Sequence, residues 1–289
     1  MAEYIICTDT GSDLTQKLYD DYNIVPLKME YEIDGTTYED DYSDEALKAF
    51  YQKMRDGAVA KTSQVNTARY VEFFTELTKK ADTVIYIGLS SGISGSFNNS
   101  MNAAKEVMEN NPGCKIYTVD TLGACLMGGM LSISASINRA NGMSAEDNVK
   151  WLENQRKYIN VYFTTPDLTY LQRGGRVSKT SAIVGTALGI NPILTVTPDG
   201  KLTSCDKVRG EKQTIARIAD KIKNTSDDLS DTSLYIAHTD CYDRAVGIAE
   251  KYVAELGFKD YVLTNIGSII GAHTGPGLVA LFYYGNERK

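Results

Sequence analysis

Apolar and polar positions in the first half of the chain follow two alternating periods. Short apolar runs at residues 4–9, 83–88 and 114–120 are typical of buried strands. Between them, apolar residues recur at helical spacing, and we expect helices to begin near Asp13 and after the capping residue Ser43. Strands that alternate with helices predict a parallel sheet with helices on both faces.

The pattern changes near residue 159. Beyond it we expect short strands, an apolar helix at 181–190 and a hairpin with its turn at Asp199-Gly200. The order of these elements predicts a mixed sheet with helices on one side. The fold class is therefore α/β with two domains: an N-terminal parallel-sheet α/β/α domain at 1–159 and a C-terminal mixed-sheet domain at 160–289.

Two shorter segments of the N-terminal domain are also predicted. Asp34-Gly35 lies between β-prone flanks, which indicates a small hairpin near residues 24–40. "KTSQVN" at Lys61–Asn66 is expected to be a polar loop that leads into a helix.

Composition and charge exclude several function classes. The 289 residues are 43% hydrophobic and 23% charged, and the formal net charge of −7 argues against a nucleic-acid partner. "MAEYIICTD" lacks the features of a signal peptide, and the charge-free stretch Thr121–Asn138 is expected to be a buried helix. We expect a cytoplasmic protein without stable membrane insertion, while transient membrane contact stays open. Five cysteines and two histidines form no zinc or disulfide spacing, so no metal is expected.

The loop "GLSSGISGS" at Gly88–Ser96 has two functional interpretations. Its first five residues match the G-x-S-x-G pattern of a nucleophile elbow, and Ser90, Asp240 and His273 follow one another in the order of α/β-hydrolases. Alternatively, a helix starts near Ser94 or Gly95, and the serines and exposed amides at its N-terminus bind an anion. A purely structural serine cap is the third interpretation.

Three further loops carry candidate chemistry. Thr62–Gln64 is a hydroxyl-rich segment before a helix, Gln172–Lys179 places Arg173 and Arg176 around two glycines, and Gly271–Gly277 is a rigid turn around His273. These loops contain no Asp or Glu that could hold the magnesium ion of a phosphate-transferring enzyme. Together they indicate a site that holds an anion without processing it.

In this order, the motifs resemble the DegV family of bacterial proteins. The resemblance runs from "CTDTGSDL" at Cys7–Leu14 through "KTSQ", "LSSGISGS", "LQRGGRVSK" and "KVRG" to "GAHTGPG". It covers essentially the whole chain, and six motifs in series make it specific. One position departs from the family, which usually has Pro after TSQ where this chain has Val65.

The resemblance implies a long-chain fatty acid bound between the two domains. Its carboxylate is expected on Thr62 and Ser94, supported by a polar network that includes Ser63, Gly95 and His273. From the residues themselves, a neutral cradle of hydroxyls and amides can bind a carboxylate without a costly buried ion pair. The helices 122–137 and 181–190 are rich in apolar and small residues and are candidates to line the tail.

The resemblance also implies a partner. Family members act as the acyl-carrying subunit of a two-part fatty acid kinase, whose separate ATP-dependent subunit phosphorylates the bound carboxylate. Arg209 matches an arginine associated with partner docking, and Arg173 and Arg176 are further candidates for that contact. We therefore expect a non-catalytic lipid-binding subunit without a cofactor. A serine hydrolase that uses Ser90 and His273 is the alternative.

Overall fold

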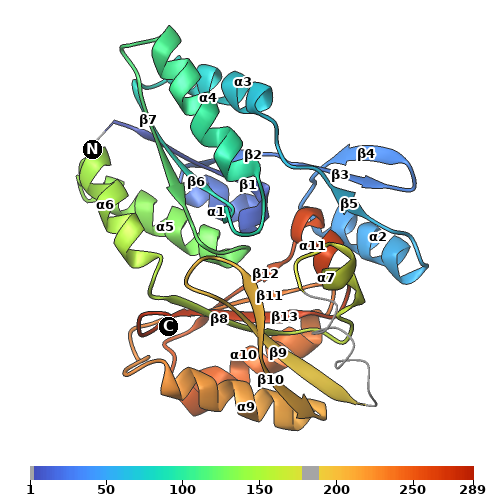
Figure 1. The fold of residues 1–289 in the computed structure, drawn as a ribbon. Helices are drawn as coiled ribbons and strands as arrows, with labels where there is room; N and C mark the ends of the chain where they lie inside the picture. The colour runs from blue at the N-terminus through green and yellow to red at the C-terminus, as the bar shows by residue number, and fades with distance from the viewer. Residues whose placement is uncertain (1–2, 178–188) are drawn as a thin grey trace.

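The chain forms two main sheets, one above the other, in an α/β fold (Figure 1). The structure is a computed structural model, and it describes residues 3–177 and 189–289. A parallel four-stranded sheet belongs to the first half of the chain, and a separate mixed six-stranded sheet belongs to the second half. The predicted fold class is confirmed.

The first sheet has the strand order β2-β1-β6-β7, and all its pairs are parallel. Its interior strands are buried on both faces, which explains their continuous apolar sequence. The strands are β1 (Ile5–Asp9), β2 (Ile24–Leu27), β6 (Thr83–Gly88) and β7 (Lys115–Asp120).

Polar side chains fix where most helices of this half begin. Thr15, Ser43, Asn66 and Ser144 each accept a hydrogen bond from a backbone amide in the first helical turn. Asp13 does not start a helix as predicted, because it is buried in a left-handed conformation (φ 52°) after a short 3-10 helix at Thr10–Ser12. The helices are α1 (Gln16–Asp21), α2 (Asp44–Arg55), α3 (Thr67–Thr78), α4 (Ser96–Asn110), α5 (Leu126–Ala140) and α6 (Ala145–Gln155).

A third, small sheet extends from the first half, with the order β4-β3-β5. Its strands are β3 (Glu30–Ile33), β4 (Thr36–Glu39) and β5 (Lys61–Thr62). Asp34 and Gly35 form the predicted turn, both with positive φ, but the hairpin begins at Glu30 because residues 24–27 belong to the main sheet. Lys61–Thr62, predicted as loop, is a strand paired with β3.

The second main sheet has the order β10-β9-β8-β13-β11-β12, with β11 and β12 parallel and the other pairs antiparallel. Its strands are β8 (Ile159–Thr164), β9 (Ile190–Val196), β10 (Leu202–Arg209), β11 (Leu234–His238), β12 (Tyr261–Asn265) and β13 (Val279–Tyr284). The helices are α7 (Thr169–Arg173), α9 (Glu211–Asn224), α10 (Tyr242–Leu256) and α11 (Ser268–Thr274). The hairpin at Asp199-Gly200 is confirmed, whereas 181–188 of the expected helix 181–190 lies outside the described residues.

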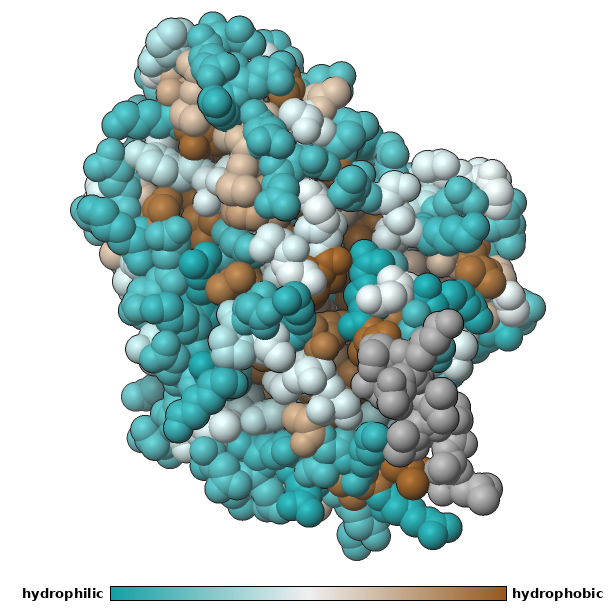
Figure 2. All heavy atoms as spheres, in the orientation of Figure 1, coloured by the Kyte–Doolittle hydropathy of each residue, from teal (hydrophilic) through white to brown (hydrophobic). Residues whose placement is uncertain are grey.

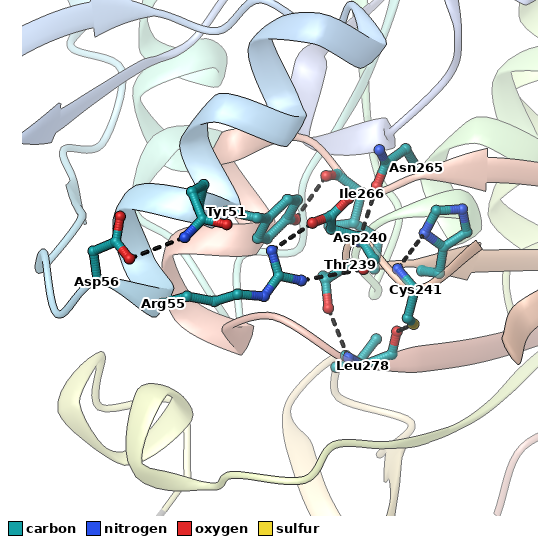
Figure 3. A network of polar contacts seen from close by, with 11 residues as sticks. Tyr51, Arg55, Asp56, Thr239, Asp240, Cys241, Asn265, Ile266 and Leu278 are labelled. Carbon is teal, nitrogen blue, oxygen red and sulfur yellow. Dashed lines mark hydrogen bonds and ion pairs between the residues drawn. The ribbon is translucent and has the colours of Figure 1, made fainter. Parts of the chain in front are cut away.

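Helix α11 follows β12 in sequence but is bonded to the first half of the chain. The hydroxyl of Tyr51 on α2 donates to the carbonyl oxygen of Ile266 (2.7 Å), just before α11. Nearby, Arg55 forms an ion pair with Asp240 after β11 (2.5 Å; Figure 3). The predicted boundary at residue 159 stays a prediction, because elements from beyond it contact the first half.

Candidate functional site

The predicted loops meet where the strands of the parallel sheet end. β1 and β6 are neighbours in the middle of the sheet, but the chain goes on from β1 to β2 at one edge and from β6 to β7 at the other edge. The connections diverge at this point, and ligands of α/β proteins usually bind in the crevice that this leaves at the carboxyl ends of the strands. A cavity of about 260 Å³ lies here, which we call the head-group cavity. Its described lining residues are Met29, Thr62, Ser63, Gln64, Leu89, Ile93, Ser94, Gly95, Arg176, Ile269, Ile270 and His273.

Thr62 and His273 form the central contact of this cavity. The hydroxyl oxygen of Thr62 on β5 lies 2.7 Å from Nε2 of His273 on α11, although 211 positions separate the two residues in sequence. The rigid turn predicted around His273 is wrong, because this residue lies in the last turn of a helix that ends at Gly275. The predicted proximity of the two side chains is present.

Burial controls the charge of His273. Desolvation, with a smaller contribution from the nearby Arg176 cation, lowers the pKa of His273 from 6.5 to about 4. The imidazole is therefore neutral at neutral pH. Its other nitrogen, Nδ1, faces Gly174 so closely that a Cβ built on that glycine would lie 2.3 Å away.

Arg176 gives the head-group cavity a positive charge. Its side chain is half-buried, and burial lowers the pKa of its guanidinium. Nε is a buried donor that has no hydrogen-bond partner among the described residues. Within residues 3–177 and 189–289, no carboxylate forms an ion pair with it. An arginine stays protonated in proteins, so Arg176 adds a cation to the neutral hydroxyls and amides of this cavity.

The serine loop lies across the cavity from Thr62. Helix α4 begins at Ser96, one residue after the predicted region, and the hydroxyl of half-buried Ser94 donates to the hydroxyl of Ser96 (3.0 Å). A Cβ on Gly95 would lie 2.0 Å from Oε1 of Gln64, so this glycine lets the two loops approach closely. Gln64 was missed as a site residue, although it belongs to the same TSQ segment as Thr62.

The structure contradicts the hydrolase interpretation. Ser90 is completely buried, and its hydroxyl donates to the carbonyl oxygen of Gly200 in the β9–β10 turn (3.0 Å). It is not bonded to His273, which contacts Thr62 instead, and Asp240 is paired with Arg55. A nucleophile must be in reach of its base, so these residues do not form a triad.

A second cavity, of about 50 Å³, lies along a neighbouring face of α11, and we call it the apolar cavity. It is lined almost entirely by apolar side chains of both halves of the chain. On the face drawn in Figure 2, apolar side chains lie in a hollow between the upper and lower halves. The described lining residues are Ala124, Cys125, Val161, Phe163, Val196, Leu202, Ile266, Ile270, Thr274, Leu278, Ala280 and Phe282.

The remaining predicted arginines lie on the surface. Arg173 is exposed and stacks over the ring of Tyr170 (5.6 Å), and Arg209 is exposed at the end of β10. Neither lines the head-group cavity. In the described parts of the chain, no group of three or more acidic, His or Cys residues could hold a metal ion. No helix in those parts is long and apolar enough to span a bilayer.

The fold and the site define a two-sheet α/β protein with a cationic, hydroxyl-lined cavity beside an apolar one. The chain belongs to the DegV family: a family model described as "Uncharacterised protein, DegV family COG1307" matches residues 4–286. A DegV domain-containing protein of Clostridium perfringens is 35% identical over 290 residues, which cover 100% of both chains.

Solved structures agree with this assignment. A DegV lipid-binding protein of Thermotoga maritima is 27% identical, with a TM-score of 0.88 over 100% of both chains. A DegV family protein of Thermus thermophilus whose structure concerns fatty acid binding is also 27% identical, with a TM-score of 0.88 over 98% of this chain and 99% of that one. DegV of Bacillus subtilis, a fatty acid-binding protein, is 27% identical, with a TM-score of 0.86 over 99% of this chain and 100% of that one.

Proposed function

We propose that this chain binds a long-chain fatty acid, with the carboxylate in the head-group cavity and the tail directed into the apolar cavity. The observation that carries the proposal is the position of these two cavities along one helix, α11. An amphiphile with one negative charge matches a site that has the Arg176 cation at one end, with no carboxylate of the described chain paired to it, and apolar walls at the other. The fatty acid-binding relatives of Thermus thermophilus and Bacillus subtilis support the same ligand class.

Thr62, Ser94 and Arg176 would hold the carboxylate. Nδ1 of His273 has no acceptor among its contacts in the described chain, so we place the imidazole proton on Nε2, where it donates to Thr62. The hydroxyl proton of Thr62 is then free to donate to the ligand. Ser94 can redirect its hydroxyl from Ser96 to a carboxylate by rotation about one bond, and Arg176 compensates the negative charge.

The acyl tail would supply most of the affinity. Each buried methylene contributes about 0.8 kcal/mol, whereas a neutral hydrogen bond contributes about 0.5–1.5 kcal/mol net. The head-group residues therefore mainly fix the position of the carboxylate. A protein whose tail contacts supply affinity and whose head-group contacts supply position is suited to present the carboxylate of its ligand to another protein.

That other protein would be a separate ATP-dependent kinase. A carboxylate oxygen attacks the γ-phosphorus of ATP, the bond to the β-phosphate oxygen breaks, and acyl phosphate and ADP are formed. The partner would hold the nucleotide and its magnesium, and this chain would need no cofactor of its own. The exposed Arg173 and Arg209 are the side chains that we assign to contact with the partner.

Lipid extraction from the purified protein, followed by mass spectrometry, tests the ligand. We expect one long-chain fatty acid per chain, and protein that purifies empty and ignores added oleate and palmitate would refute the proposal. Thr62→Val and Ser94→Ala should misplace the carboxylate and reduce acyl-phosphate formation with a kinase partner. Ser134→Ala is the matched control, because Ser134 is a half-buried hydroxyl bonded to Tyr284 and lines neither cavity.

A further inference from the structure

Three buried side chains of the first half of the chain anchor the start of α11. Tyr51 donates to the carbonyl oxygen of Ile266 (2.7 Å). Asp13 accepts a hydrogen bond from the amide of Gly267 (2.8 Å), and Asp40 accepts one from the amide of Ser268 (3.0 Å). Consecutive backbone groups are thus held by rigid partners, which fixes the direction of the helix that follows.

The anchored helix lines both cavities with neighbouring faces. Ile269 and His273 line the head-group cavity, whereas Ile266 and Thr274 line the apolar cavity. Among the described lining residues, Ile270 alone belongs to both. Its side chain is only partly buried because it faces these spaces, while its backbone carbonyl is occupied by the hydroxyl of Thr274 (3.1 Å).

Ile270 therefore lies where the polar lining gives way to the apolar lining. The described lining of the apolar cavity offers a carboxylate almost no polar partner, because the hydroxyl of Thr274 already donates to Ile270, so methylene groups gain by moving past this point and a carboxylate does not. The β-branched side chain has few rotamers, and the anchored backbone cannot retreat easily. A tail that enters the apolar cavity must pass beside this residue.

We propose that Ile270 is a specificity-determining residue, which sets the size of the acyl segment that passes from the head-group cavity into the apolar cavity. The inference rests on the proposed function, because it concerns the same ligand. It assigns the selection of tails to one side chain of α11 and not to the walls of the apolar cavity alone.

A chain-length series measures this selection. Dissociation constants of saturated acids from C8 to C18 are measured for the wild type and for Ile270→Phe. Each further methylene that is buried should tighten wild-type binding about fourfold. In Ile270→Phe the gain in affinity per methylene should stop at the acyl chain length that reaches position 270. Ile137→Phe is the control, because Ile137 on α5 is exposed and lines neither cavity, so this variant should leave the length dependence unchanged.

A second variant, Ile270→Ala, tests the same inference if Ile270→Phe does not fold. Fatty acids that end in a cyclohexyl ring must carry the ring past position 270. The wild type should bind them at least tenfold more weakly than straight acids of equal carbon number, and Ile270→Ala should lose most of this discrimination. Circular dichroism and thermal unfolding show whether each variant is folded.

The outcomes separate this inference from the proposed function. A wild type that binds no fatty acid of any length would refute the function itself. A wild type with the expected length dependence, shared by folded Ile270→Phe, would refute only the role of Ile270. Unchanged discrimination against ring-ended acids in Ile270→Ala would do the same.

Discussion

Removal of the Arg176 charge should change the protonation of His273. In the folded protein the pKa of His273 is about 4 instead of 6.5, and this difference corresponds to about 3 kcal/mol. Desolvation is the larger cause and Arg176 the smaller one. Arg176→Met should therefore raise the pKa of His273 by part of the difference and leave it below 6.5, because the imidazole stays buried.

The same shift makes stability depend on pH. The folded pKa lies below the unfolded one, so neutral His273 favours the folded state fully above pH 6.5, and this contribution is lost as the pH falls from 6.5 through about 4. Arg176→Met should reduce that loss. A bound carboxylate should act in the same direction as the substitution, since a nearby anion favours the imidazolium.

Imidazole NMR resonances provide the assay, because the chain has only two histidines. The second, His238, is buried near Asp240, and burial lowers its pKa too, so it serves as an internal reference that Arg176→Met should not affect. We expect an upward shift for His273 in Arg176→Met and in wild type with palmitate. Titration of wild-type His273 at its ordinary value, or an unchanged pKa in Arg176→Met, would refute the reasoning.

Three further substitutions test other contacts. Burial raises the pKa of Asp40 from 3.8 to about 6. The unfolding free energy of the wild type should therefore fall by about 3 kcal/mol as the pH rises through this range. Asp40→Asn avoids this loss, so in urea it should be more stable than wild type at pH 7 but not at pH 3.5. Gly174→Ala should displace His273 and raise its pKa in the NMR titration, whereas Gly247→Ala, which has open space around it, should not. Ser90→Ala should lower the unfolding free energy by about 1–3 kcal/mol in urea while fatty acid binding persists, because it removes a buried hydrogen bond and no nucleophile. Three results would contradict these assignments: Asp40→Asn or Ser90→Ala as stable as wild type at pH 7, an unchanged pKa of His273 in Gly174→Ala, or a loss of binding in Ser90→Ala.

The sequence pattern predicted helix starts and turns correctly where neighbouring residues alone determine them. Ser43 and Ser144 cap their helices, and Asp34-Gly35 forms its turn, because these structures depend on neighbouring residues. Helix α11 was missed because its start is held by Asp13, Asp40 and Tyr51, which lie 254, 228 and 215 positions from their partners. The pattern of apolar and polar residues within 268–274 contains no information about these long-range hydrogen bonds.

At the site, too, the sequence identified residues by their motifs but did not reveal which of them are buried. Thr62 and His273 were identified by their motifs, and the structure brings them together. The same sequence pattern suggested a nucleophile at Ser90, yet burial against Gly200 excludes that role. Arg176 was assigned with Arg173 to partner contact, since a sequence does not tell which of two nearby arginines turns inward.

Val65 shows how a departure from the family pattern can be accommodated at the site. The resemblance leads us to expect proline here, which lacks a backbone N–H. In this chain the amide of Val65 donates to the hydroxyl of Ser96 (3.0 Å), which in turn accepts from Ser94. The carbonyl oxygen of Val65 accepts from Asn99 on α4 (2.8 Å). The amide of Val65, which proline would lack, thus bonds the TSQ segment to Ser96 beside Ser94. The substitution therefore adds a hydrogen bond between the two segments that carry Thr62 and Ser94, and the TSQ segment stays attached to α4.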